Sequence, residues 1–158
     1  MRAQGVSASM SVMALFAKNW EEVDRRLRAV VEPELRPGEE IVGVVHANQA
    51  KTFSAELFAV AVTPDRLVIV PLDKKMNASG EAESVTRDDV RSSSVWGWGG
   101  SVSDFLSPRS GNEIRIETPR RSYKLMVLGG TMLENSLAGD GQLGGLEAFI
   151  AFLQSGEH

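Results

Sequence analysis

Cysteine is absent from the 158-residue sequence, and no apolar run reaches the length of about 20 residues that a membrane-spanning helix needs. The first absence excludes disulfide bonds and thiol catalysis, and it suits a reducing compartment. One stretch could be mistaken for a secretion signal, "MSVMALFA" (10–17), but it is interrupted by serine and continues directly into charged sequence. The sequence therefore predicts a cytoplasmic protein.

Histidine is almost as scarce, since His46 and His158 are the only two. No His, Asp and Glu residues have the spacing of metal ligands, and His46 alone would have to serve any Ser–His–Asp triad. Asp88 and Asp89 could be paired acid–base carboxylates. Neighbouring strand residues point to opposite faces, however, so a solvated break between two strands is the favoured interpretation. We expect a non-enzymatic protein with no catalytic residue, cofactor, metal or small-molecule substrate.

Positive charge is limited, with 17 basic residues against 21 acidic ones and a net charge of −4. This balance opposes nucleic-acid binding, because neutralising phosphates requires clustered Lys and Arg. Gly139, Gly141 and Gly144 match a G-x-G-x-x-G pattern. A dinucleotide-binding motif needs a strand before the glycines and a second strand with an acidic residue about 20 positions after them. The sequence ends before such a second strand could follow. These glycines are therefore predicted to lie in a flexible connection over 129–145.

What the sequence does contain begins with a stripe of apolar residues near its N-terminus. They recur at alternating spacings of three and four, which is typical of one helix face. The stripe consists of Met13, Phe16, Trp20, Val23, Leu27 and Val30. Pro33 disfavours helical geometry at Glu32 and is expected to end the helix. Residues 1–33 are predicted to form a disordered segment followed by this amphipathic helix, and residues 34–158 a separate domain.

The period changes after residue 40. Segments 41–47, 53–62 and 67–72 are rich in β-branched and aromatic residues on both faces, and are predicted to be buried strands. Further strands are expected within 84–98, with a break at 88–89, and at 113–117 and 123–127. A closing helix is predicted from a stripe of apolar residues near the C-terminus. That stripe is Leu146, Phe149, Ile150 and Leu153.

Two segments, "VTPDRLVIV" (62–70) and "ETPRRSYKLMV" (117–127), each place Thr-Pro-x-Arg between apolar runs. In the first, Pro64 presets φ for a turn and Asp65 can bond back to the backbone. Nothing else repeats between the two segments, so we interpret them as one hairpin turn used twice and not as a duplicated site. The expected core residues are Leu67, Ile69, Ile114, Ile116, Leu125, Phe149 and Leu153.

This order of elements resembles the short bacterial pleckstrin-homology-like (PH-like) domains. The resemblance covers residues 35–155 and rests on "LRPGEEIVGVV", "VTPDRLVIV", "VTRDDVRSSSV", the hairpin 113–127 and the closing helix. It implies a mainly β fold with seven strands, in which two nearly orthogonal antiparallel sheets form a barrel capped by the C-terminal helix. The N-terminal helix lies outside the family pattern. The family carries no catalytic residues. Relatives that bind phosphoinositides use basic residues in the first two strands and their loop, where "HANQAKT" (46–52) offers only Lys51.

Two candidate binding surfaces follow. The aromatic and aliphatic residues that could contact a partner are Phe16, Trp20, Val23, Leu27, Trp96 and Trp98. The cations that could form an anion-binding rim, if their loops meet, are Lys74, Lys75, Arg120 and Arg121. We expect a binding or assembly module that contacts a protein partner or a second copy of itself. The alternative is a peripheral membrane adaptor that binds anionic lipid through the rim. The N-terminal helix could pack on its own barrel or on a neighbouring chain, and we favour the neighbouring chain. Trp96 and Trp98 are a plausible receiving surface in either case.

Overall fold

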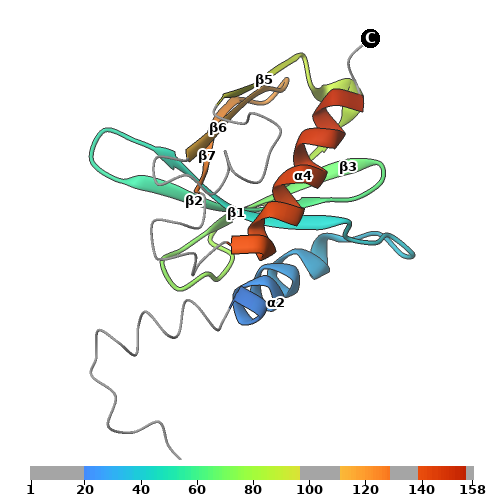
Figure 1. The fold of residues 1–158 in the computed structure, drawn as a ribbon, viewed down its shortest axis with the longest axis vertical. Coiled ribbons are helices and arrows are strands. Elements are labelled where there is room, and N and C mark those ends of the chain that lie inside the picture. The colour runs from blue at the N-terminus through green and yellow to red at the C-terminus, as the bar shows by residue number, and fades with distance from the viewer. Residues whose placement is uncertain (1–19, 97–110, 129–138, 156–158) are drawn as a thin grey trace, which may run out of the picture.

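The computed structural model describes residues 20–96, 111–128 and 139–155 (Figure 1). The predicted mainly β architecture, with seven strands and a helix at each end, is confirmed. The helices are α2 (Trp20–Val31) and α4 (Gly139–Ser155). The strands are β1 (Gly43–Ala50), β2 (Ala55–Val62), β3 (Arg66–Leu72), β4 (Glu83–Thr86), β5 (Ser92–Trp96), β6 (Gly111–Glu117) and β7 (Ser122–Leu128). Two short 3-10 turns, η1 (Glu32–Glu34) and η2 (Arg87–Asp89), follow α2 and β4.

The strands belong to one antiparallel sheet in the order β4-β3-β2-β1-β7-β6-β5. Strands β1 to β4 pair in chain order, and so do β5 to β7. These two runs are joined where β1 meets β7, at the single partner pair of Asn48 and Met126. A sheet can bend strongly at so narrow a junction, and this one curls into a half-barrel (Figure 1).

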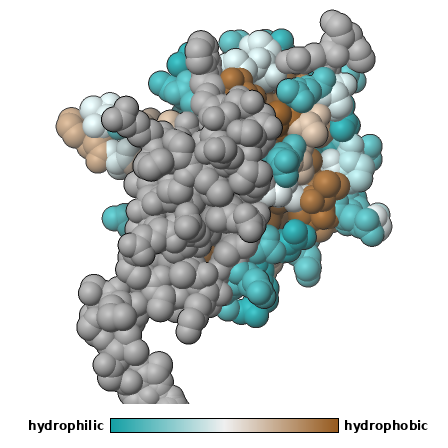
Figure 2. Space-filling model, in the orientation of Figure 1, coloured by the Kyte–Doolittle hydropathy of each residue, from teal (hydrophilic) through white to brown (hydrophobic). Residues whose placement is uncertain are grey.

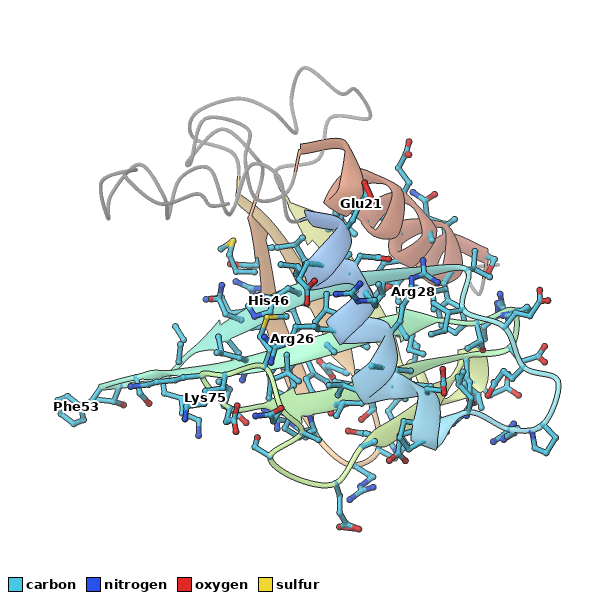
Figure 3. The ribbon with its side chains drawn as sticks, turned by 90° about the horizontal axis from the view of Figure 1, so that it is seen from below. Glu21, Arg26, Arg28, His46, Phe53 and Lys75 are labelled. Atoms are coloured by element: carbon cyan, nitrogen blue, oxygen red, sulfur yellow. The ribbon has the colours of Figure 1, made fainter. Side chains whose placement is uncertain are left out.

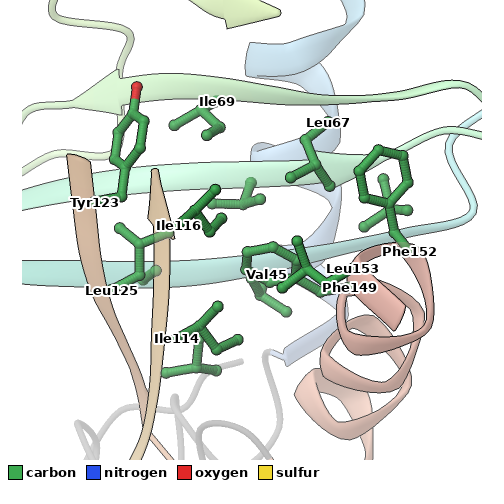
Figure 4. Close-up of a cluster of buried hydrophobic side chains, with 14 of the residues drawn as sticks. Val45, Leu67, Ile69, Ile114, Ile116, Tyr123, Leu125, Phe149, Phe152 and Leu153 are labelled. Atoms are coloured by element: carbon green, nitrogen blue, oxygen red, sulfur yellow. The ribbon is translucent and has the colours of Figure 1, made fainter. Parts of the chain in front are cut away.

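The main hydrophobic core fills the inner side of the curled sheet, where side chains of β1, β3, β6, β7 and α4 meet (Figure 4). The strands of the second run bury one face only, because Ile114 and Leu125 are fully buried while their neighbours Arg115 and Lys124 are exposed. The predicted core is confirmed throughout, since every one of its residues is buried: Leu67, Ile69, Ile114, Ile116, Leu125, Phe149 and Leu153.

A second apolar layer lies on the outer face of β1, β2 and β3, beneath α2. Leu27 of α2 is fully buried there, and burying one such side chain stabilises the fold by about 1.5–3 kcal/mol. β3 therefore has two buried faces, with Leu67 in the main core and Val68 under α2. This explains why its sequence is an unbroken apolar run and not an alternation. The helix ends at Val31, and Pro33 lies in η1, as the sequence predicted.

The C-terminal helix corrects the sequence prediction. α4 begins at Gly139, well before Leu146, so the last part of the connection predicted over 129–145 is helical. Gly145 of this helix serves packing, because a Cβ added there would lie only 2.2 Å from the carbonyl oxygen of Val44 in β1. Glycine has a low helix propensity, and for this reason the sequence pattern predicted a flexible connection here. The close packing of α4 on the β1 backbone, which only glycine allows at position 145, favours the helix instead.

The two Thr-Pro-x-Arg segments adopt the same turn, as predicted. The Thr63 N–H donates to the carbonyl of Arg66 at 2.9 Å, and the Thr63 hydroxyl accepts from the N–H groups two and three residues further on. Thr118 makes the equivalent bonds, with its N–H donating to the carbonyl of Arg121 at 3.0 Å. The side chain that bonds back to the backbone is thus the threonine, whereas the sequence suggested Asp65.

Candidate functional site

Three connections meet at one end of the curled sheet. Because the strands are antiparallel, the end at which β1 and β3 finish is also the end at which β2, β4 and β7 begin. The β1–β2 turn (51–54), the β3–β4 loop (73–82) and the β6–β7 turn (118–121) therefore share this end, which we call the loop end. The structure thus places both halves of the predicted basic rim, 74–75 and 120–121, at the same end of the sheet.

A buried carboxylate connects β4 with the β6–β7 turn at the loop end. Glu83 is 8% exposed, accepts a hydrogen bond from the Tyr123 hydroxyl, and has one oxygen 3.1 Å from Oγ1 of Thr118. Burial and the hydrogen bond to Glu83 raise the pKa of Tyr123 well above its usual value, so the phenol keeps its proton and acts as a donor. These groups satisfy one another and hold the two runs of strands together.

Arg121, one of the four predicted anion-binding residues, is held in contacts within the protein. Its guanidinium lies 3.2 Å from Glu56 and stacks over the rings of Tyr123 and Phe58, at 4.5 and 5.7 Å from their centroids. Lys51 approaches the same Glu56 carboxylate at 3.9 Å. Part of the positive charge at the loop end is therefore neutralised, and Arg121 has a packing role.

Lys74, Lys75 and Arg120 are exposed, and none of them forms an ion pair within the described ranges. The main chain of Lys75 is nevertheless fixed. Its N–H donates to Asp73 at 2.8 Å, and its carbonyl accepts from Arg26 of α2 at 2.8 Å. These bonds tie the β3–β4 loop to α2 and leave the lysine side chain in solvent (Figure 3). Three of the four rim residues are thus available to an anion.

Phe53 is the feature of the loop end that the sequence analysis missed. It is 97% exposed at the tip of the β1–β2 hairpin and points away from the rest of the molecule (Figure 3). The hairpin is regular, with Ala50 paired to Ala55 and the Lys51 N–H donating to the Ser54 carbonyl at 2.8 Å. It stands out from the body of the molecule as a separate projection (Figure 2). The sequence assigned position 53 to a buried strand, but that strand begins two residues later.

The structure describes only some of the partner-binding candidates of the N-terminal helix. Val23 and Leu27 pack on the outer face of their own sheet, so this part of α2 adopts the intramolecular arrangement. Trp20 is the first described residue of α2, and Phe16 lies outside the described residues. The surface that receives the described part of α2 consists of β1, β2 and β3. Contrary to the expectation from the sequence, Trp96 does not receive this part of the helix, because β5 lies at the far edge of the sheet.

The other aromatic candidates lie at an edge strand. Trp96 is the last residue of β5 and stands opposite Glu113 of β6, whereas Trp98 lies outside the described residues. In the described part of the chain, β5 pairs with β6 alone. A hollow of about 620 Å³ lies along β5, β6 and β7, and its lining includes Ser92, Ser93, Ser94, Arg115 and Lys124.

The most buried ion pair among the described residues lies at the end opposite the loops and ties residues 34–41 to β3. Arg66 is 5% exposed and donates from Nε and Nη2 to the two carboxylate oxygens of Glu39, at 2.8 and 2.7 Å. Nη2 also donates to the Glu34 carbonyl at 2.7 Å. The hydrogen bonds from Arg66 lower the pKa of Glu39 to about 2. This arrangement is a structural clamp whose groups are already engaged.

The other residues considered as catalytic candidates, His46, Asp88 and Asp89, lie within regular elements of the fold. His46 lies in β1 beside α2 (Figure 3), and burial lowers its pKa. Asp88 and Asp89 lie in η2, which confirms the predicted break between strands, and Asp89 accepts from the Thr86 N–H at 2.9 Å in a capping box. Across 20–96, 111–128 and 139–155, no three His, Cys, Asp or Glu residues are placed to hold a metal ion.

Comparison with known proteins identifies a fold but no activity. No family model and no curated protein matches the chain. The hSac2 domain from human phosphoinositide phosphatase Sac2 is 10% identical with a TM-score of 0.50, and the match covers 87% of this chain and 85% of that one. The C-terminal domain of an unknown protein from Leishmania infantum is 13% identical with a TM-score of 0.43, over 85% of this chain and 97% of that one. At 10% identity, the likeness to the hSac2 domain concerns the fold alone. Neither helix in the described ranges combines the length and apolarity needed to cross a membrane.

Proposed function

We infer that this chain is a PH-like domain in which β1–β4 and β5–β7 form two nearly orthogonal sheets. Two observations support this arrangement. The runs of strands are joined through the single pair of Asn48 and Met126, and β6 and β7 cross β1 and β3 steeply (Figure 4). α4 closes the barrel by contributing Phe149 and Leu153 to the main core. The resemblance to the bacterial members of this family rests on the sequence segments given above.

The function that we propose is binding and assembly without catalysis, through contact with a protein partner or a second copy of the chain in the cytoplasm. The observation that carries it is the edge strand β5, whose sequence SSSVW contains no charged residue and no proline. A strand in this position presents a row of backbone N–H and C=O groups with which another strand can pair. Trp96, a partner-binding candidate, ends this strand.

The ionisable groups of the interior support a non-enzymatic function. Arg66 and Glu39 are paired with each other, and Glu83 is occupied by Tyr123 and Thr118. Catalytic acids and bases need an unoccupied position within hydrogen-bond reach of a substrate. These buried groups instead use their hydrogen bonds to hold the fold, so none is prepared for proton transfer.

Measurement of the native mass as a function of protein concentration tests the proposal. Sedimentation equilibrium should show a mass that rises from one chain towards two or more as the concentration increases. A mass of one chain at every attainable concentration would contradict assembly with a second copy.

A second candidate function, the peripheral membrane adaptor, is favoured by the loop end. Burying an aromatic side chain such as Phe53 in an apolar phase contributes about 1.5–3 kcal/mol. Exposed cations such as Lys74 and Lys75 each add up to about 1 kcal/mol near an anionic membrane surface. Overall net charge of −4 works against this function, and we therefore place it second.

Co-sedimentation with vesicles of anionic phospholipid separates the two functions. Under the leading proposal the protein stays in the supernatant at physiological salt. Sedimentation of the wild type that Phe53→Ser abolishes would favour the membrane function. Val42→Ser is the matched control, because Val42 is an aliphatic residue that is 58% exposed and lies at the opposite end of the sheet.

A further inference from the structure

We propose that the chain assembles with a second copy by antiparallel pairing of the two β5 strands about a two-fold axis at Ser94. The inference rests on the proposed function and specifies its surface and geometry. The seven-stranded sheets of two chains would then continue into one another through their β5 edges, and the outer faces of β5–β7 would form one surface.

The two edges of the sheet differ in the way that this proposal requires. The β4 edge carries features that discourage pairing with another chain: it has four residues, it includes the buried acidic side chain of Glu83, and the chain continues from it into η2 with Arg87. β5 has five residues, none of them charged and none proline. Of the two edges that the described strands form, the β5 edge is therefore the one whose chemistry favours pairing with another strand.

The residues of β5 favour a second copy as the occupant. When a two-fold axis passes through Ser94, every residue of the strand has a counterpart, and the two serines at the centre stand opposite each other. Such an isologous contact is self-complementary only if no charge meets its own copy. The serine hydroxyls are uncharged, so no like charges meet at the axis.

The charges nearest the axis do not oppose this contact. Ser94 stands opposite Arg115 of β6, so two copies of Arg115 would be separated by three strand spacings, or about 14 Å. This separation exceeds the Debye length of about 8 Å at physiological ionic strength. Arg115 also has a local counterion, because its Nε lies 2.6 Å from Glu113. Repulsion between the two copies of Arg115 is therefore small.

The size of the contact predicts its strength. Five residues from each chain bury less than the about 1,200–2,000 Å² of a stable interface. We expect a dissociation constant between about 10 μM and 1 mM, so the test must cover that range.

The experiment uses the full chain and two opposite substitutions, Ser94→Glu and Ser94→Lys. Each would place like charges about 5 Å apart at the two-fold axis, and should raise the dissociation constant about tenfold or more. An equimolar mixture of S94E and S94K should restore association, because unlike charges then meet. Ser122→Lys is the matched control: it adds the same charge at an exposed position of β7, away from the edge. Far-UV circular dichroism verifies that each variant is folded.

Each result has a definite meaning. Loss of association in both single variants, recovery in the mixture and wild-type behaviour of S122K support pairing through β5. If the wild type associates and all variants associate equally, pairing through β5 is wrong while assembly with a second copy stands. If the wild type remains a single chain at about 1 mM, both this inference and assembly with a second copy fail.

Discussion

Gly144→Ala and Gly145→Ala place the same methyl group on neighbouring residues of α4, and they should change stability in opposite directions. Gly144 is exposed, and nothing lies within 4 Å of a Cβ added there. Gly145 is buried, and its added Cβ would lie 2.2 Å from the carbonyl oxygen of Val44, 2.8 Å from the carbonyl carbon, and 2.9 Å from Cγ1 of Val45. The pair therefore separates helix propensity from packing.

The magnitudes decide which effect dominates at each position. Replacing a glycine inside a helix by alanine stabilises the helix by about 0.5–1 kcal/mol, and Gly144→Ala should show this gain. At Gly145 the obstacle is the main chain of β1, which is fixed by pairing with β2 and cannot rotate away. Overpacking of this kind costs about 1–3 kcal/mol and exceeds the gain. Because the gain from helix propensity applies at both positions, the two variants should differ in unfolding free energy by the overpacking cost alone, about 1–3 kcal/mol.

Urea unfolding followed by far-UV circular dichroism measures this difference directly. A domain of this size should also show a difference of about 2–4 °C in Tm for each kcal/mol. The expected order of stability is Gly144→Ala, wild type, Gly145→Ala. If Gly145→Ala is as stable as Gly144→Ala, the reasoning from the contact between α4 and β1 is refuted.

Two further predictions concern ionisable groups. Glu39→Gln leaves Arg66 buried without its carboxylate, so urea titrations near neutral pH should show a loss of about 3–5 kcal/mol. Glu40→Gln, at an exposed neighbour, should change nothing, and equal stability of the two variants would mean that the clamp contributes little. The Glu39 contribution should persist above pH 4.5 and be lost towards pH 2, because its pKa is lowered from 4.5 to about 2. His46 should affect stability at higher pH than Glu39 does. Burial lowers the pKa of His46 from 6.5, so the folded state should be fully stable with respect to this group above pH 6.5 and should lose stability as the pH falls below it. His46→Gln should flatten this part of a thermal-unfolding pH profile, and an unchanged slope would assign the effect to another group.

The features that the sequence predicted well are those that depend on residues only a few positions apart in the chain. Ile114 and Ile116 alternate with Arg115, and this local pattern was sufficient to identify a strand with one buried face. The Thr-Pro-x-Arg turns were likewise recognisable, because Thr63 and Thr118 bond to backbone groups only two and three residues away. Hairpins and their core residues follow from such short-range information.

The features that the sequence did not reveal depend on residues far apart in the chain. Arg120 and Arg121 are adjacent and chemically identical, yet only Arg121 is engaged, because the fold brings Glu56 and Phe58 to it. The start of α4 was missed for a similar reason, since the contact that favours glycine at this crossing is made with β1. Phe53 was assigned to a strand because exposure at a hairpin tip has no periodic pattern.

The edge position of β5 depends on a few residues between it and β4. Consecutive antiparallel strands usually form a hairpin, and pairing of β4 with β5 would have left neither of them at an edge. Thr86 and Asp89 instead close a capping box that ends β4 and turns the chain through η2. The Arg91 N–H then donates to the Glu117 carbonyl at 2.8 Å, which directs the chain to β6. Among the described strands, the break at 88–89 thus leaves β5 with β6 as its one partner, and it creates the edge on which the proposed assembly depends.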